Sequence, residues 1–360
     1  MREGLITDAP PGYNPRWMTD TRDGLHAALR SYADASELPP GEDRVRARVV
    51  AATAVHDALA GGPVVPVVYT IPLVVGPIPR KAAMGDALRT AAPFLRVRHR
   101  ALVLQCLHNG APRTLLWNPT DVRHALRIPA FDSLRRGAGR IAAATLLDIA
   151  PSVVVQTAQL GLRADNVDVL AYDQMDGQYP SAMLARFPRA RMALTAEEWS
   201  RLERPTPRDA AFIVHGPEID RGRVHVVERS WVVGDGLVLV QTGGRRKGHL
   251  ALVANTARGV MVASGNALSI DGYVPTNSRL PGVAAYAHMH RVAFVGAYPR
   301  VGDPSSEAMA IEYALADRHP NAPAFPFVMP TAEIVPSLIA PGVSPAVLAP
   351  DLALGTVVRV

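Results

Sequence analysis

The sequence predicts an α+β protein with a helical N-terminal part, a C-terminal part rich in antiparallel β-meander, and an extended proline-rich C-terminal arm. Three observations predict this class. Apolar residues at helical spacing fill 1–62, β-rich runs between glycine turns fill 223–265, and prolines recur from 320 to 360. Hydrophobic residues make up 48% of the 360 residues and charged residues 19%, as in folded globular proteins. A chain of this length can bury a full core.

Composition and pattern divide the chain into four segments. These are a helical segment (1–62), a mixed α/β region (63–209), a β-meander region closed by a helix (210–318) and an extended apolar arm (319–360). We expect them to form one compact unit. Within the first segment, Thr19–Ala33 and Glu42–Ala60 carry apolar residues on one helical face, and Gly61 and Gly62 end the second helix.

Extended and helical runs alternate in the mixed region. Val64–Val75 is β-branched but contains two prolines, so we expect an edge strand or an extended strap. Leu95–Leu107 predicts a strand that pairs with Thr114–Trp117 through the turn at Asn109-Gly110. The other expected elements are helices at 119–126, 132–149 and 195–202 and strands at 152–157 and 167–172.

The stretch Arg223–Gly265 contains four β-rich runs separated by three short turns, at 234–236, 243–248 and 255–259. Glycines in the turns supply the positive φ angles that hairpins need. Valine and leucine in the runs suit a pleated, half-buried surface. We therefore expect an antiparallel meander, followed by a helix that starts at Asp303-Pro304 and runs to about Arg318.

The C-terminal arm is apolar and almost uncharged between its prolines. A disordered tail would be polar, and proline prevents long helices and central strands. We therefore expect the arm to lie extended against an apolar surface of its own domain or of a neighbouring subunit. The residues predicted at this interface are Phe325, Phe327, Ile334, Leu338, Ile339 and Leu348.

The net charge of +6 is carried almost entirely by arginine, because Lys81 and Lys247 are the only lysines. Arginine pairs bidentately with carboxylates and phosphates. Three clusters suit contacts with acidic partners or with nucleic acid. They are Arg96, Arg98 and Arg100 on one strand face, Arg135, Arg136 and Arg140, and Arg245, Arg246 and Lys247 at a hairpin tip. Solvated surface is the alternative, because aromatic content is 6% and no nucleic-acid-binding motif accompanies the clusters.

No apolar run reaches the ~18 residues that a membrane helix needs, and the first residues lack the apolar core of a signal peptide. Cys106 is the only cysteine, which excludes an intrachain disulfide and a zinc cluster built on cysteines. We expect a cytoplasmic or virion protein without a cofactor.

Cys106 and His249 are a candidate catalytic pair, because a cysteine nucleophile needs a base to hold it as a thiolate. The segment Gly248–Val253 follows a Gly-Asp turn at 234–235 and resembles the histidine strand of papain-like peptidoglycan amidases. The resemblance covers roughly thirty residues, including the turn, and implies an amidase-like cysteine hydrolase. In those families the cysteine opens a helix and lies closer to the histidine. Here Cys106 lies in an apolar strand, which favours a buried structural cysteine.

His288 and His290 are candidate metal ligands, because in the strand expected there both imidazoles share one face. A third ligand would come from His215, His225 or His249. The alternative is a set of surface or core histidines, since no spaced metal motif accompanies them.

Four aspartates, Asp165, Asp168, Asp173 and Asp176, cluster around Tyr172. Paired carboxylates can perform acid–base or metal chemistry. The alternative for the last of them is a simple turn with the glycine that follows it.

These patterns favour a structural assembly protein, a viral capsid or capsid-associated subunit that self-associates through its extended arms. The alternative is a bacterial enzyme, either a cysteine hydrolase that uses Cys106 and His249 or a metal-dependent enzyme that uses His288 and His290. A third hypothesis is a small-molecule or protein binding module built on the meander.

Overall fold

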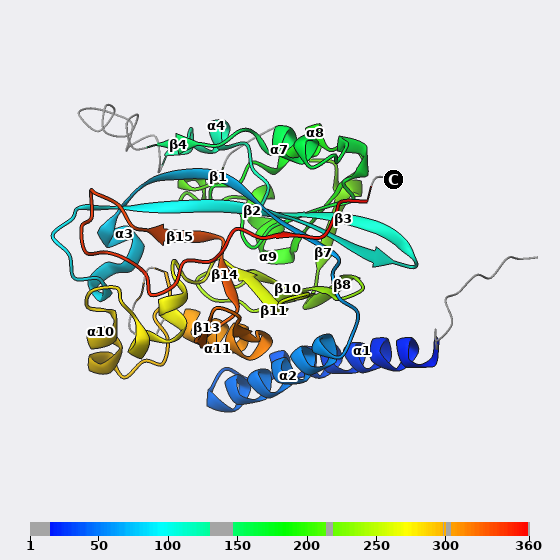
Figure 1. The fold of residues 1–360 in the computed structure, drawn as a ribbon, viewed down its shortest axis with the longest axis horizontal. Helices are drawn as coiled ribbons and strands as arrows, with labels where there is room; N and C mark the ends of the chain where they lie inside the picture. Colours follow the sequence, from blue (N-terminus) through cyan, green and yellow to red (C-terminus); the bar gives the residue numbers. More distant parts are fainter. Residues whose placement is uncertain (1–14, 130–146, 214–218, 298, 300–303, 359–360) are drawn as a thin grey trace, which may run out of the picture.

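The computed structural model describes residues 15–129, 147–213, 219–297, 299 and 304–358. Two β-sheets lie face to face, and helices cover the outer face of each sheet (Figure 1). The protein is therefore a mixed α+β protein, as predicted, with layers in the order helix, sheet, sheet, helix. None of the described helices is both long enough and apolar enough to span a lipid bilayer.

Over the described residues, the larger sheet has nine strands, of which β4 and β15 pair off its main path β16-β1-β2-β3-β5-β6-β7. Strands β1 to β3 pair antiparallel, whereas β3, β5, β6 and β7 run parallel. The predicted turn between β2 and β3 is confirmed, since Asn109 and Gly110 have φ of 52° and 79°. The strands are β1 (Val67–Pro79), β2 (Phe94–His108), β3 (Ala111–Trp117), β4 (Asp148–Ile149), β5 (Val169–Ala171), β6 (Arg191–Thr195), β7 (Val224–Val227), β15 (Ala332–Val335) and β16 (Ala353–Leu354).

The second sheet has the order β14-β11-β10-β9-β8 and contains the predicted meander. Its strands are β8 (Ser230–Gly234), β9 (Leu237–Gln241), β10 (Leu250–Thr256), β11 (Gly259–Ser264) and β14 (Val328–Pro330). Strands β8 to β11 pair antiparallel in sequence order. The first predicted run is split, because its initial part is β7 and joins the larger sheet beside β6. A separate two-stranded ribbon is formed by β12 (Arg318–His319) and β13 (Ala322–Pro326).

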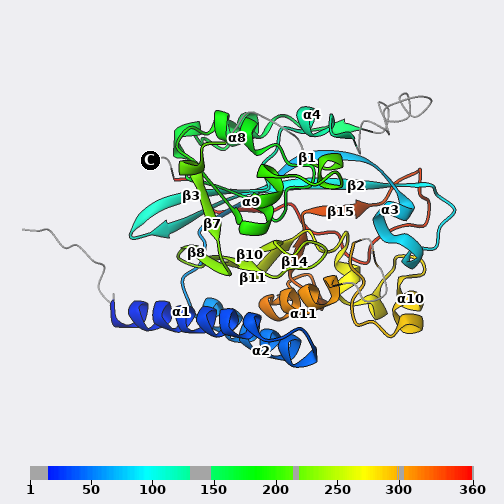
Figure 2. The same cartoon turned by 180° about the vertical axis from the view of Figure 1, so that it is seen from behind.

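Helices α1, α2 and α11 cover the second sheet, and α7 and α8 cover the larger sheet (Figures 1 and 2). The helix expected at 195–202 is confirmed as α9, which Thr195 caps by accepting a hydrogen bond from Glu198 N on its Oγ1 at 3.4 Å. The α-helices are α1 (Pro15–Glu37), α2 (Glu42–Ala60), α3 (Arg80–Met84), α4 (Val122–Ala125), α7 (Val153–Gln159), α8 (Pro180–Arg186), α9 (Ala196–Glu203), α10 (Val283–His290) and α11 (Ser305–Leu315). Short 3-10 helices are η1 (Gly85–Ala87), η2 (Ala164–Asn166), η3 (Asp209–Ala211), η4 (Arg221–Arg223), η5 (Ile270–Tyr273) and η6 (Pro275–Asn277).

The central strands β9 and β10 are buried on both faces. Leu239 and Leu252 point into the core between the two sheets, whereas Val240 and Val253 point into the core beneath the helices. Successive side chains of a strand point to opposite faces, so a strand between two cores is apolar throughout. This explains why these runs lack the alternation of a half-exposed strand.

Several predicted elements are wrong. Strand β1 is not an edge strand, because β2 pairs along one side of it and β16 and β4 pair along the other. A register shift next to Pro72 accommodates the proline. The run 152–157 is helix α7, because the Ser152 Oγ accepts from Val155 N at 3.4 Å and this cap outweighs the β propensity of three valines. Most of the helix expected at 132–149 lies outside the described residues, and its end is β4.

The C-terminal arm is extended, as predicted, and it packs on its own chain. Strand β14 pairs with β11, β15 with β2, and β16 with β1. Phe325, Phe327 and Ile334 are buried inside the protein, so these side chains are not available to a partner. Ile339 is half-buried, and Leu338 and Leu348 are exposed. The arm therefore completes both sheets.

Candidate functional site

A cavity of about 230 Å³ lies where strands of both sheets end, and we call it the strand-end cavity. Asn118 follows β3, Asp173 follows β5, Arg245 follows β9, Gly265 follows β11, and Thr331 follows β14, and all five line it. Strands β3 and β5 run parallel, as do β11 and β14, so within each pair the carboxyl ends meet at one edge. Segments beyond such strand ends commonly form binding sites in sheets of this kind.

The rest of the lining is largely apolar. It comes mainly from β1, from the region of α4 and from the segment after β11. The larger apolar side chains include Leu73, Ile78, Leu126, Ile128, Phe212 and Leu268. A cavity with a broad apolar lining and a few polar groups suits a small organic ligand.

Asp173 is the most buried acid of the cavity, with 2% of its surface exposed. Its Oδ2 accepts a hydrogen bond from Thr331 Oγ1 at 3.0 Å, and its backbone N–H donates to Asn118 Oδ1 at 2.9 Å. Burial in the apolar lining disfavours the charged form and raises the pKa of Asp173 to about 7. This carboxyl can therefore exchange a proton near neutral pH.

Gly265 allows the strand-end segments to approach closely. A Cβ atom at this position would lie 2.7 Å from Asp173 Oδ2 and 3.2 Å from Thr331 Oγ1. A side chain here would push the carboxyl and the hydroxyl apart. The glycine is therefore part of the geometry that sets the environment of Asp173.

His249 lies beside Asp173, with 4.0 Å between Nε2 and Oδ2. Its Nε2 accepts from Gly265 N at 3.2 Å, which places the ring proton on Nδ1, 3.4 Å from Thr242 Oγ1. Thr242 Oγ1 in turn donates to Glu312 Oε1 at 3.0 Å. Burial, together with the nearby Arg245, lowers the pKa of His249 to about 3, so the imidazole is neutral at physiological pH.

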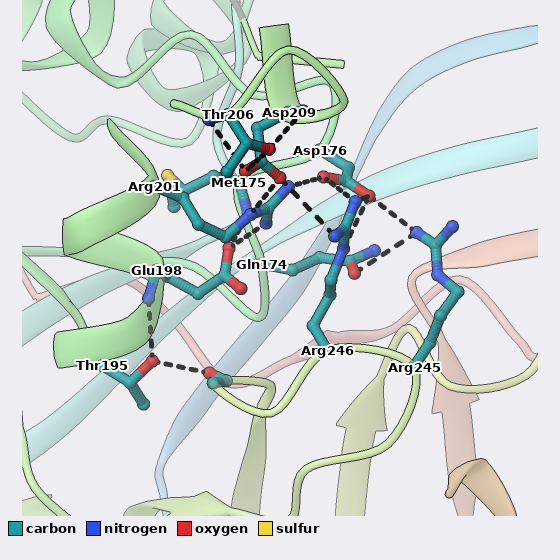
Figure 3. Close-up of polar contacts among 11 residues, drawn as sticks. Gln174, Met175, Asp176, Thr195, Glu198, Arg201, Thr206, Asp209, Arg245 and Arg246 are labelled. Carbon is teal, nitrogen blue, oxygen red and sulfur yellow. Dashed lines mark hydrogen bonds and ion pairs between the residues drawn. The ribbon is translucent and has the colours of Figure 1, made fainter. Parts of the chain in front are cut away.

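Asp176 lies on the same loop as Asp173 but in a cationic environment. Arg201 comes from α9, and Arg245 and Arg246 come from the loop after β9, and all three reach Asp176 (Figure 3). The distances to its carboxylate oxygens are 2.5, 2.9 and 2.9 Å. Burial alone would raise the pKa of Asp176, but the three guanidinium groups outweigh it and lower the pKa.

The loop after β5 thus carries two carboxyl groups with opposite properties. The pKa of Asp173 is raised to about 7 by burial, whereas guanidinium groups hold Asp176 ionised. Pairs of titratable groups whose environments push their pKa values apart are typical of acid–base sites. The acidic cluster predicted around Tyr172 therefore includes both of these carboxyls, while Asp165 and Asp168 are not among the lining residues of the cavity.

The predicted pair of Cys106 and His249 does not form. Cys106 pairs with Arg113 near the start of β3, whereas His249 lies beyond the other end of that strand, where Asn118 is. Five strand residues separate these ends by roughly 17 Å. Cys106 is 1% exposed in the core between the sheets, and burial raises the pKa of its thiol to about 12.

The predicted metal ligands His288 and His290 lie on helix α10, not on a strand. Positions i and i+2 of a helix do not share a face. Both side chains are exposed, and the His290 ring packs against Tyr286, with 4.3 Å between ring centroids. Among the possible third ligands, His225 packs on Trp231, and His215 lies outside the described residues.

The strand-end cavity does not fit a metal ion either. In the described part of the chain, no group of three or more histidine, cysteine, aspartate or glutamate side chains is arranged to hold one. The Nε2 lone pair of His249 accepts a backbone hydrogen bond, and the carboxylate of Asp176 is held by three guanidinium groups. Those cations would also repel a metal ion.

The arginines predicted to contact acidic partners bind acids of their own chain. Arg98 and Arg100 both donate to Glu333, which is fully buried, and Arg245 and Arg246 bind Asp176. Arg96 lies on β2 opposite Val335, and Lys247 is exposed. The cluster of Arg135, Arg136 and Arg140 lies outside the described residues. Contact with nucleic acid and self-association stay predictions.

Comparisons with known proteins give a likeness in structure alone. No protein-family model and no curated protein matches the chain. A probable metal-dependent hydrolase from Staphylococcus aureus is similar at a TM-score of 0.48 and 14% identity, over 69% of this chain and 84% of that one. A quorum-quenching N-acyl homoserine lactone lactonase has a TM-score of 0.45 and 14% identity, over 69% and 86%. The hydrolase AbOPH of the β-lactamase superfamily has 0.45 and 11%, over 81% and 95%.

The prediction of a viral capsid or structural protein is wrong. The arm on which the prediction depended is built into this chain's own sheets. The enzyme alternative stays a prediction. The residues that the alternative proposed are nevertheless not brought together.

Sequence reasoning missed most of the site. Asn118, Thr331 and Gly265 each follow a strand, but the sequence does not show which strand ends share an edge. Arg245 lies at the tip of an expected hairpin, where a solvated charge is the usual outcome. The signal that pointed to the site was the pair of aspartates after a β-rich run, Asp173 and Asp176.

Proposed function

We propose that the protein is a metal-independent enzyme that acts on a small organic molecule in the strand-end cavity, with Asp173 as its acid–base group. One observation carries the proposal: a carboxyl with a pKa of about 7 lines a largely apolar cavity, next to a second carboxyl that stays ionised. A general base works best when its pKa lies near the working pH. The finer fold assignment, to the metallo-β-lactamase superfamily, belongs to the same proposal and is supported by the two sheets packed between helices.

The chemistry that this geometry supports is hydrolysis of an ester-like bond. Asp173, when ionised, accepts a proton from a water molecule that attacks the substrate, and returns the proton to the leaving group. Thr331 Oγ1 holds the carboxyl through a 3.0 Å hydrogen bond, and the backbone contact with Asn118 fixes the loop that carries it. No metal is needed for this proton transfer.

Hydrolysis of p-nitrophenyl esters with acyl chains of two to eight carbons, in excess EDTA, tests the proposal. We expect turnover that rises with pH around 7 and that falls by about 10²–10⁴ in Asp173→Asn. Asp165→Asn makes the same chemical change at a half-exposed carboxyl that pairs with Arg163, and it should leave the rate unchanged. Loss of activity in EDTA with recovery on adding Zn²⁺ would refute the metal-independent mechanism.

A second candidate is a binding module without catalysis, which the apolar lining of the cavity favours. It predicts saturable binding of small apolar molecules and no turnover of any ester in the series. Equal turnover by the parent protein and Asp173→Asn would remove the acid–base role and favour this candidate.

A further inference from the structure

The strand-end cavity combines apolar walls with cationic groups. Among the residues that the structure describes, the arginines that line it are Arg100 and Arg245. His99 also lines it, but burial and the charge of Arg100 lower the pKa of His99 to about 4, so this ring is neutral. Within the described ranges, the cationic groups of the cavity that can receive an anion are therefore these two guanidinium groups.

The guanidinium of Arg100 is already bound to other groups of the protein. It is 1% exposed, its Nη2 donates to the buried carboxylate of Glu333, and its Nη1 contacts Ala349 O at 3.4 Å. Moving this guanidinium would separate a fully buried cation from its carboxylate, and Glu333 would lose one of its two guanidinium partners. Arg100 is therefore part of the wall and not a ligand-binding group.

Arg245 is more exposed, at 29% of its side chain, and its loop is anchored at both ends. Gly243 O accepts from Asn266 Nδ2 at 2.9 Å, and Gly248 O accepts from Thr195 Oγ1 at 2.8 Å. The side chain of Arg245 reaches Asp176 Oδ2 at 2.9 Å and Gln174 Oε1 at 3.4 Å (Figure 3). These backbone contacts hold the loop in place, so the guanidinium of Arg245 lies at the cavity in a defined position.

Among the charges around Asp176, Arg245 lowers the pKa of this carboxyl most, but it is one of three guanidinium groups that do so. Arg201 and Arg246 remain at 2.5 and 2.9 Å from its carboxylate oxygens if Arg245 turns away. An incoming anion can therefore replace Asp176 as the partner of Arg245, because the carboxylate of Asp176 stays paired with Arg201 and Arg246. Of the two cavity arginines, Arg245 is the one whose partner can be exchanged.

We propose that the strand-end cavity binds a carboxylate that carries a short apolar chain, and that Arg245 receives the carboxylate group. The chain lies along the apolar wall that includes Leu73, Ile78 and Leu126. A single negative charge fits better than two, because Asp173 and Asp176 lie in the same site and repel a dianion such as a phosphate monoester. The cavity of about 230 Å³ is smaller than most drug-sized sites and so favours a short chain.

This inference rests on the proposed role of the cavity as the ligand site, and it specifies the class of ligand. Such a carboxylate is the acid released when an ester of the same chain is hydrolysed. It would therefore bind as the product of the proposed reaction and inhibit it competitively.

Calorimetric titration with hexanoate and with hexanamide tests the inference, because the two probes differ in charge and share the apolar chain. We expect hexanoate to bind at least about tenfold more tightly than hexanamide, with an affinity that falls as salt is added. Arg245→Gln should abolish this preference. Arg245→Lys should retain part of it, because lysine keeps the positive charge but cannot bind a carboxylate through two parallel hydrogen bonds. Arg163→Gln is the matched control, since this side chain is 78% exposed and outside the cavity lining.

Equal affinity for the two probes, binding of neither, or an unchanged preference in Arg245→Gln would overturn the inference. If Arg245→Gln does not fold, the comparison of the two probes on the parent protein and on Arg245→Lys still decides it. Ester hydrolysis is measured on the same preparations, so the two proposals fail separately. A preserved hexanoate preference without turnover would contradict only the enzyme, and turnover without the preference would contradict only the ligand class.

Discussion

Replacing Glu333 by alanine should strongly destabilise the protein. This side chain is fully buried and accepts three hydrogen bonds, from Arg98 Nη2 at 2.8 Å, from Arg100 Nη2, and from Ala349 N at 2.7 Å. Alanine would leave the Arg100 guanidinium, which is 1% exposed, without its carboxylate. Breaking a buried pair from one side costs about 3–5 kcal/mol, because the remaining charge stays buried.

Equilibrium unfolding in urea measures this loss. Asp351→Ala is the matched control, since Asp351 binds Arg98 at 3.1 Å but is 61% exposed, and an exposed pair contributes at most about 1 kcal/mol. Glu333→Gln keeps an acceptor and should fall between the two. If Glu333→Ala lowers the free energy of unfolding by less than about 1 kcal/mol, as the control does, then water solvates the Arg100 guanidinium in the variant and the reasoning is refuted.

Three further measurements address other residues. The pKa of Asp173 is about 7 in the folded state against about 3.9 unfolded, so its stabilising contribution is complete below about pH 4 and is lost as pH rises through 7. In urea, the stability of the parent protein relative to Asp173→Asn should therefore fall by about 1.4 kcal/mol per pH unit across that window, and a difference independent of pH would contradict this. Cys106, buried and with its pKa raised to about 12, should resist iodoacetamide at about pH 8 until the protein is unfolded; native labelling at the unfolded rate would contradict this. Gly236→Ala should cost at least about 2 kcal/mol in urea, because φ is +73° and the new Cβ would lie 2.3 Å from Pro63 O. Gly110→Ala has a similar φ of +79° and open space, so equal costs for the two variants would exclude the clash.

Local patterns predicted the elements whose stability is local. The helix Glu42–Ala60 has Gly61 as its C-cap, the cap at Thr195 opens α9, and the Asn109-Gly110 turn joins β2 to β3. Each of these depends on residues within a few positions of one another. The mixed α+β class and the meander β8–β11 could therefore be predicted from the sequence.

Predictions that depended on the partner of a segment were wrong where tertiary pairing decided the outcome. Strand β1 contains prolines typical of an edge strand, yet Leu354 and Ala353 of β16 pair with Val68 and Tyr69 and place β1 inside the sheet. No local rule relates segments so far apart in the chain. For the same reason the sequence does not show whether the arm packs on its own domain or on a neighbouring subunit. In the folded protein the arm supplies strands β14, β15 and β16, which pair with strands of its own chain.

The residue types that can perform chemistry are visible in the chain before it folds, including the two aspartates that follow β5. Their roles come from the folded arrangement. Asp173 is placed in an apolar cavity, where burial raises its pKa to about 7, and Asp176 is placed among three guanidinium groups that keep it ionised. The two carboxyls lie on one loop, so their difference comes from neighbours such as Arg201 and Arg245, which distant segments supply. A pKa depends on burial and on nearby charge, and both are properties of the folded chain.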